Sequence, residues 1–190
     1  KQRSGARNGR IRFKNGSITV GINTRTGCID DYRVEGRRVL GKAACRPLMM
    51  KDSPDPWAMQ IRKFNRVEQR FRPMKRTEAA RFAGVIGKEE MAPARVIEDG
   101  PVRSVVEALL TAGNSAVVLR YRLPKEGTQI GLELHVHWNE KDRMLKLELP
   151  LGHVGAGTRF VGQGAYGVSE LPMNGDESVA RQWVAVLDEK

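Results

Sequence analysis

Hydrophobic and polar residues alternate along much of the chain, starting near the N-terminus. Within residues 10–22, two alternating runs flank the pair Asn15-Gly16. Because Asn-Gly tolerates positive φ at both central positions of a type I′ turn, this segment predicts a β-hairpin with that turn. Two further short strands are predicted over 28–34 and 38–40. Glycine-containing turns are predicted before them, at Thr26-Gly27 and Glu35-Gly36.

The same alternation returns in later parts of the chain. Strands are predicted at 47–50, 94–98, 102–110, 117–123, 132–138, 145–149 and 182–187. Helix is the alternative for Val105 to Ala112, but the valines and the alternation that follows favour a sheet. The strands 132–138 and 145–149 are predicted to form a second hairpin across the polar turn from Asn139 to Arg143. Many short alternating strands predict an all-β, antiparallel sandwich.

Three segments depart from this pattern. Prolines between Lys51 and Trp57 exclude both helix and central strand, so a structured loop is predicted there. The glycine-rich segment from Phe160 to Asn174 is predicted to be a long loop. Between Gln60 and Glu90, charged residues crowd isolated aromatic residues, and the sequence supports no detailed prediction.

The composition is that of a globular domain. Of the 190 residues, 40% are hydrophobic and 29% are charged, and no apolar run is long enough for a transmembrane helix. We expect a linker or disordered segment over 1–9, a single sandwich domain over 10–190, and no membrane partner. The N-terminus lacks the apolar stretch of a signal peptide, and Cys28 and Cys45 are interpreted as unpaired thiols. Both features favour a cytoplasmic location.

The net charge of +11 raises the question of a nucleic-acid partner. Clustered Lys and Arg side chains bind nucleic acids by releasing phosphate counterions. Here the arginines are spread along the chain and often alternate with apolar positions, as in Arg10 to Phe13, which is typical of the solvent face of a strand. The sequence therefore does not favour a nucleic-acid partner, and a basic nucleic-acid-binding β domain stays a remote alternative.

Two groups of residues could carry chemistry. His135 and His137 share one strand face about 7 Å apart, a spacing that two ligands of one metal could use, but no third ligand is evident. Asp52 and Asp55 accompany Trp57 in the proline-bounded loop. There they could form an acid/base pair or a sugar-binding rim on which the indole stacks, or they could be Asx-turn residues that shape the loop.

Five segments, taken in order, resemble the domain that follows the catalytic domain in family 38 α-mannosidases. They are the strand and turn from Asn15 to Gly27, the Asp-x-x-Asp-x-Trp loop from Asp52 to Trp57, the Glu-Asp-Gly-Pro-Val-Arg segment from Glu98 to Arg103, the hairpin from His137 to Leu147, and the elements around Tyr166, Glu177 and Gln182-Trp183. The resemblance runs from about Arg10 to Leu187. It implies a β-supersandwich of the kind shared with galactose mutarotase, which agrees with the strands predicted above.

The resemblance also implies that this chain is one piece of a larger domain. The further strands that follow the Gln-x-Trp strand in the family have no counterpart here. An incomplete sandwich leaves a sheet edge open, and such an edge can pair with a second copy, so a homo-oligomer is one expected form.

The family's members are retaining, zinc-dependent enzymes that hydrolyse terminal α-mannosides, and their nucleophile and zinc ligands belong to the preceding catalytic domain. No position here matches those motifs, so we expect no catalytic residue, metal or cofactor in this chain, and the isolated chain should be inactive. The implied partners are the catalytic and remaining sandwich portions of the same parent protein, with an α-mannoside in the cleft that they share. The candidate substrate-rim residues are Asp52, Asp55, Trp57, Tyr166 and Glu177.

An alternative function is a stand-alone, mutarotase-like carbohydrate-binding module. Trp57 and Trp138 suggest it, because indole rings stack on sugars. Trp138, however, shares a predicted strand face with Leu132 and Leu134, which favours a place in the core.

Overall fold

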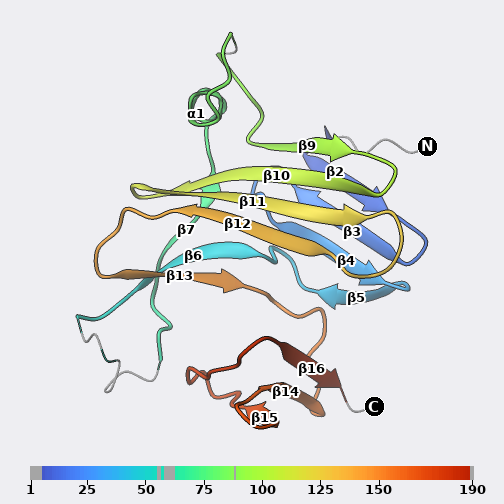
Figure 1. Cartoon of the computed structure of the whole chain (residues 1–190), viewed down its shortest axis with the longest axis vertical. Helices are drawn as coiled ribbons and strands as arrows, with labels where there is room; N and C mark the ends of the chain where they lie inside the picture. Colours follow the sequence, from blue (N-terminus) through green and yellow to red (C-terminus); the bar gives the residue numbers. More distant parts are fainter. Residues whose placement is uncertain (1–5, 55–56, 58–62, 88, 189–190) are drawn as a thin grey trace.

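The computed structural model describes residues 6–54, 57, 63–87 and 89–188 (Figure 1). Nearly all regular structure in these residues is antiparallel strand, arranged in four sheets. The predicted all-β sandwich class is therefore confirmed. No helix in the described part of the chain has the length and apolarity that a membrane span requires.

The first sheet has the strand order β1-β2-β3-β4-β5. Its strands are β1 (Ala6–Arg7), β2 (Arg10–Lys14), β3 (Ile18–Asn23), β4 (Ile29–Val34) and β5 (Arg37–Leu40). The first sheet thus begins at Ala6. The sandwich domain was predicted to begin at residue 10. Asn8-Gly9 and Glu35-Gly36 each join two strands with positive φ at both residues, the requirement of a type I′ turn. The predicted turn at Glu35-Gly36 is confirmed.

The hairpin of β2 and β3 is confirmed, but its predicted turn type is wrong. Neither Asn15 nor Gly16 has a positive φ. Instead, Asn15 Oδ1 accepts hydrogen bonds from the backbone N–H groups of Ser17 (2.8 Å) and Ile18 (2.7 Å). Asn15 Nδ2 also donates to the carbonyl oxygen of Pro124 at 2.9 Å, in the second sheet. The side chain therefore shapes this turn, as in an Asx turn, and ties it to the opposite layer.

The second sheet has the order β12-β11-β10-β8, with β9 also paired to β10. Its strands are β8 (Arg72–Pro73), β9 (Ala94–Asp99), β10 (Arg103–Ala112), β11 (Ser115–Pro124) and β12 (Gly131–His137). β10 confirms the strand and excludes the helix over Val105 to Ala112. Ser104, Val106 and Leu110 on its predicted inner face are buried, whereas Val102, placed on the same face, precedes the strand and is exposed.

The third sheet corrects the predicted partner of one strand. It contains β6 (Arg46–Lys51), β7 (Val67–Arg70) and β13 (Arg143–Glu148), in the order β13-β6-β7. β12 and β13 were predicted to form a hairpin, but β13 pairs with β6, from Arg143 opposite Lys51 to Glu148 opposite Arg46. The connection after β12 therefore crosses from one sheet to another. Alternation sets which face of a strand is buried, but it does not choose the neighbouring strand.

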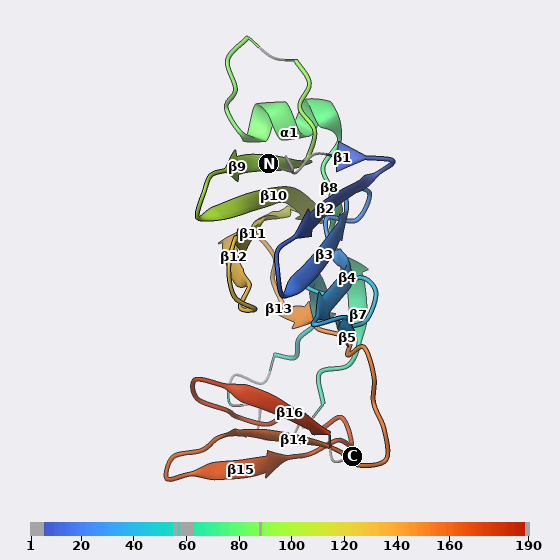
Figure 2. The same cartoon turned by 90° about the vertical axis from the view of Figure 1, so that its right-hand side faces the viewer.

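The main core lies between the first sheet and β6 on one side and the second sheet on the other (Figure 2). Its largest fully buried side chains include Ile22, Met49, Leu110 and Tyr121. Each such side chain stabilises the fold by about 1.5–3 kcal/mol relative to exposure. Trp138 packs against this core, as predicted.

The helix α1 (Arg76–Phe82) lies in the segment for which the sequence supported no prediction. Ala79 packs with Met74 against Leu109 and Val118, which face away from the main core. The helix therefore covers the outer face of β10 and β11 at one end of the molecule (Figure 1).

The fourth sheet corrects the predicted long loop from Phe160 to Asn174. β14 (Thr158–Gln163) and β15 (Val168–Leu171) lie in or overlap that segment, and β16 (Val184–Asp188) confirms the predicted last strand. Gly162 is required inside β14, because a Cβ there would lie 2.9 Å from Ala180 Cβ and 3.1 Å from Leu171 Cδ1. This sheet lies at the opposite end of the molecule from α1 (Figures 1 and 2).

Candidate functional site

Asp52 and Trp57, two of the candidate substrate-rim residues, lie in the connection after β6. The Asp52 N–H donates to the carbonyl oxygen of Asp142 at 3.0 Å, and Asp52 Oδ1 accepts from the N–H of Ser53 at 2.8 Å. The carboxylate thus takes part in shaping its own loop. The indole of Trp57 is 81% exposed, which is the accessibility that stacking on a sugar requires. Asp55 lies outside the described residues.

Tyr166 lies in the connection between β14 and β15, where Gly164 N–H donates to the carbonyl oxygen of Gly167 at 2.7 Å. Its side chain is fully exposed at the tip of this turn. An aromatic ring in that position is open to a ligand or to another protein surface.

Glu177 serves as a tether in this structure. Its carboxylate forms an ion pair with Lys146 Nζ on β13 and accepts a 3.2 Å hydrogen bond from the N–H of Phe64. The hydrogen bond from Lys146 is the main reason that the pKa of Glu177 lies below its usual value. Lys63 adds a second contact, with Asp176 at 3.3 Å. These contacts attach the segment between β15 and β16 to the sandwich.

The rim candidates therefore lie in three separate connections. Asp52 and Trp57 follow β6, Tyr166 follows β14, and Glu177 precedes β16. Of these, Asp52 and Glu177 take part in local hydrogen bonds, and Trp57 and Tyr166 are largely exposed.

The two histidines on β12 have different neighbours. His135 Nε2 lies 2.5 Å from Glu133 Oε1, and the ring of His137 contacts Phe82 of α1 edge-on, with centroids 5.4 Å apart. Among the described residues, no cluster of three or more His, Cys, Asp or Glu side chains could hold a metal ion. These histidines are therefore surface residues with local partners.

Glu107 on β10 is the most buried acidic side chain that the structure describes, at 5% exposure. Its carboxylate accepts hydrogen bonds from Arg95 Nη2 at 2.7 Å and from Arg120 Nε at 2.9 Å. Arg120 also lies 3.7 Å from Glu133 on the neighbouring strand. Because each Glu107 oxygen faces a guanidinium, this residue joins β9, β10 and β11 rather than serving as an acid or base.

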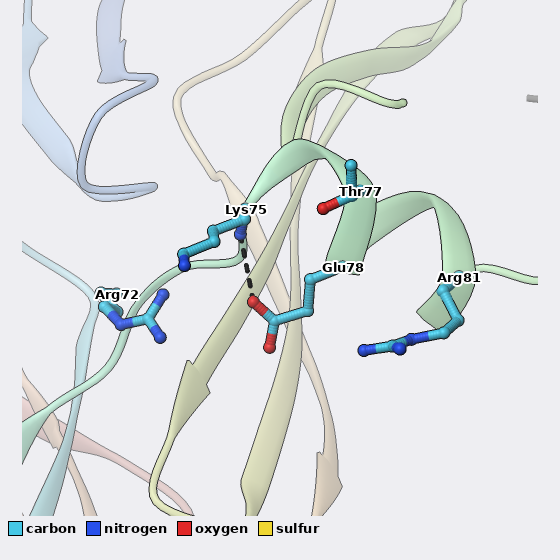
Figure 3. Close-up of a pocket in the computed structure, with 5 residues that line it drawn as sticks. All are labelled: Arg72, Lys75, Thr77, Glu78 and Arg81. Carbon is cyan, nitrogen blue, oxygen red and sulfur yellow. Dashed lines mark hydrogen bonds between the residues drawn. The ribbon is translucent and has the colours of Figure 1, made fainter. Parts of the chain in front are cut away.

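A basic pocket lies beside α1 and β8, in the segment that sequence patterns left unassigned (Figure 3). Its volume is about 330 Å³, and its lining residues are Arg72, Lys75, Thr77, Glu78 and Arg81. Glu78 Oε2 accepts a 3.1 Å hydrogen bond from the N–H of Lys75 and so caps the helix. The three cations stand around this single carboxylate. The sequence shows their charges and their closeness along the chain, but it does not show that β8 and α1 arrange these side chains around one pocket.

Cys28 and Cys45 are buried free thiols. Burial is the largest cause of the raised pKa of both groups, and it raises the pKa of Cys45 to about 12, with Cys28 as a further cause. Only the thiolate is a good nucleophile, so neither cysteine is placed for catalysis.

We expect neither thiol to react with Ellman's reagent in the folded protein at about pH 8, because burial excludes the reagent and keeps both groups protonated. Raising the pH toward the pKa of Cys45 should destabilise the fold, because the unfolded chain loses these protons first. Both thiols should react at once in denaturant, which serves as the control. Rapid reaction of either thiol without denaturant would contradict their burial.

The chain matches a known protein family. The model described as "Glycosyl hydrolases family 38 C-terminal domain" matches residues 13–190. No curated protein matches the chain. The matched range takes in the second, third and fourth sheets and most of the first, and it leaves out β1 and the start of β2.

Proposed function

Because the chain belongs to the glycosyl hydrolase family 38 C-terminal domain family, we propose that it is the non-catalytic sandwich domain of a retaining, zinc-dependent α-mannosidase. Membership makes it part of a glycosidase with a β-sandwich architecture. The match over residues 13–190 is the observation that carries the proposal. The substrate, a terminal α-mannoside, and the cytoplasmic location belong to the proposal. The two unpaired cysteines support a reducing compartment.

The described side chains fit a supporting role. The buried carboxylate of Glu107 is held by two guanidiniums, and the two cysteines are buried as protonated thiols. The described residues do not fit a zinc site, since they include no cluster of three or more His, Cys, Asp or Glu side chains that could hold a metal ion. Under this proposal the zinc ligands and the nucleophile belong to the catalytic domain of the parent protein, and no chemical step passes through this chain.

The fourth sheet supports a partner within the same parent protein. Alternation along β16 places Val184 and Val186 on one face and Trp183 and Leu187 on the other, and all four side chains are exposed. Large apolar side chains that are exposed in a group are typical of protein contact sites. A sheet with apolar side chains on both faces needs a covering layer on each side. The catalytic and remaining sandwich portions of the parent are the proposed layers.

The proposed contribution to substrate binding rests on the exposed aromatic rings. Trp57 and Tyr166 can each offer a flat apolar surface to a pyranose ring at the rim of a cleft. Glu177 is already paired with Lys146, so it acts at this rim by fixing the segment that precedes β16.

The proposal predicts that the purified 190-residue chain does not hydrolyse an aryl α-mannoside. The chain should be folded, as judged by circular dichroism. The rate of hydrolysis in its presence should equal the rate in buffer alone. A parent protein that also contains the catalytic domain should hydrolyse the same substrate. Hydrolysis by the chain that persists through repeated purification and keeps a constant specific activity would overturn the non-catalytic role.

A further inference from the structure

We propose that the basic pocket beside α1 is a binding site for a tetrahedral oxoanion, the phosphate or sulfate group of a small ligand. This site lies outside the rim candidates and does not depend on the family assignment. Its lining residues come from β8, from the residue before α1 and from α1 itself: Arg72, Lys75, Thr77, Glu78 and Arg81.

The charge of the pocket favours a dianion. Arg72, Lys75 and Arg81 are cationic and Glu78 is anionic, so the lining residues carry a formal net charge of +2. Within the described part of the chain, none of the three cations lies within ion-pair distance of a carboxylate, and Arg72 Nη1 donates a 3.3 Å hydrogen bond to the carbonyl oxygen of Pro73. Many other basic side chains of this protein do have a carboxylate partner, as Arg103 has Glu98. One carboxylate offsets only part of the charge of three cations, and an anion that binds among them would offset the remainder.

The donors of the pocket suit a tetrahedral anion. A guanidinium can donate two parallel hydrogen bonds to phosphate or sulfate oxygens, and Lys75 and the Thr77 hydroxyl can supply further donors. Figure 3 shows the Glu78 carboxylate with Lys75 and Arg72 on one side and Arg81 on the other. Glu78 Oε2 already accepts from the N–H of Lys75. Its Oε1 can accept a hydrogen bond from a hydroxyl group of an ester ligand.

The size of the pocket limits the ligand. A volume of about 330 Å³ lies at the lower end of the range of about 300–1,000 Å³ typical of small-molecule sites. That volume accommodates one oxoanion with a short organic group. The inference rests on the side chains, because α1 has only seven residues and Glu78 already caps it.

The test is a titration of the full chain with inorganic phosphate, sulfate and glycerol phosphate at constant ionic strength, followed by backbone amide chemical shifts in NMR. We expect saturable shifts centred on Thr77 and Glu78. Arg81→Gln should weaken binding by about tenfold, as expected for one lost charge-assisted contact. The matched control Arg12→Gln removes the same charge from the exposed face of β2 and should change affinity by less than about twofold.

A second variant is expected to strengthen binding, a result that loss of folding cannot produce. Glu78→Gln retains an acceptor for the N–H of Lys75 but removes the negative charge, so it should tighten oxoanion binding severalfold. Equal affinity for phosphate and glycerol phosphate would assign the site to the oxoanion itself, whereas tighter binding of the ester would assign it to an organic phosphate. The proposal is overturned if no titration saturates, or if Arg12→Gln weakens binding as much as Arg81→Gln. A short oligonucleotide is titrated as a further ligand, and the proposal is also overturned if it shifts the same amide signals with a far higher affinity.

Discussion

Gly27→Ala should lower the free energy of unfolding by about 2–4 kcal/mol. Gly27 has a φ of +73°, where an L-residue is strained by about 1 kcal/mol or more. A Cβ at this position would also lie 2.8 Å from Leu110 Cδ2 and 3.0 Å from Ala108 Cβ, in the core. Such overpacking costs a further 1–3 kcal/mol, roughly. The Gly27 carbonyl oxygen accepts the 2.8 Å hydrogen bond of the buried Tyr121 hydroxyl, so a shift of this backbone would weaken that contact as well.

The matched control is Gly36→Ala. Gly36 has a φ of +80°, yet no heavy atom lies within 4 Å of a Cβ built there. This variant should therefore show only the cost of the backbone conformation, about 1 kcal/mol. Urea unfolding followed by circular dichroism measures both. Equal losses in the two variants would mean that Gly27 does not contact β10 as described.

Glu107→Ala should lower the free energy of unfolding by about 3 kcal/mol. The substitution leaves the guanidiniums of Arg95 and Arg120 without the carboxylate that binds them both, in a site where the carboxylate is almost fully buried. Removing one member of a buried ion pair typically costs about 3–5 kcal/mol, and the partial exposure of the arginines places the expected loss at the lower end.

The control for this prediction is Glu98→Ala, which breaks the exposed pair with Arg103 on the same sheet. Exposed pairs contribute little to stability because water and salt screen them. That variant should unfold at nearly the same urea concentration as the unchanged chain. Similar losses for Glu98→Ala and Glu107→Ala would contradict the central place given to Glu107.

The sequence predicted the strands whose side chains alternate between core and solvent. Ile11 and Phe13 on β2, and Leu119, Tyr121 and Leu123 on β11, are buried every second residue, and this period is a local property that the sequence shows directly. The partner of β13 was not predictable in the same way. Its pairing with β6 joins residues far apart in the chain, and the alternation of Leu145 and Leu147 is equally compatible with either neighbour.

Glycine misled the prediction in two places. Asn15-Gly16 matched a type I′ turn, but the side chain of Asn15 accepts two backbone N–H groups and supports a different turn. Gly162 was predicted to be part of a loop, but it lies in β14. A glycine is needed there because Ala180 and Leu171 lie close to its backbone. A glycine allows both turns and close approach, and only the tertiary structure decides between them.

The candidate substrate rim stays a prediction. Exposure of Trp57 and Tyr166 suits the expected rim, and Glu177, chosen from the resemblance, proved to be paired with Lys146. The basic pocket was missed because its segment has no apolar periodicity. Ala79 and Ala80 are buried, three of the seven residues of α1 are charged, and so short a helix gives little periodicity to detect.

The central claim is that this chain is a non-catalytic part of a larger glycosidase. The most direct test is an immunoblot of the source cells with an antibody raised against the chain. A band several times heavier than 21.2 kDa is predicted, because the catalytic domain should belong to the same polypeptide. A single band at 21.2 kDa would contradict the account and would make a stand-alone carbohydrate-binding protein the function to test next.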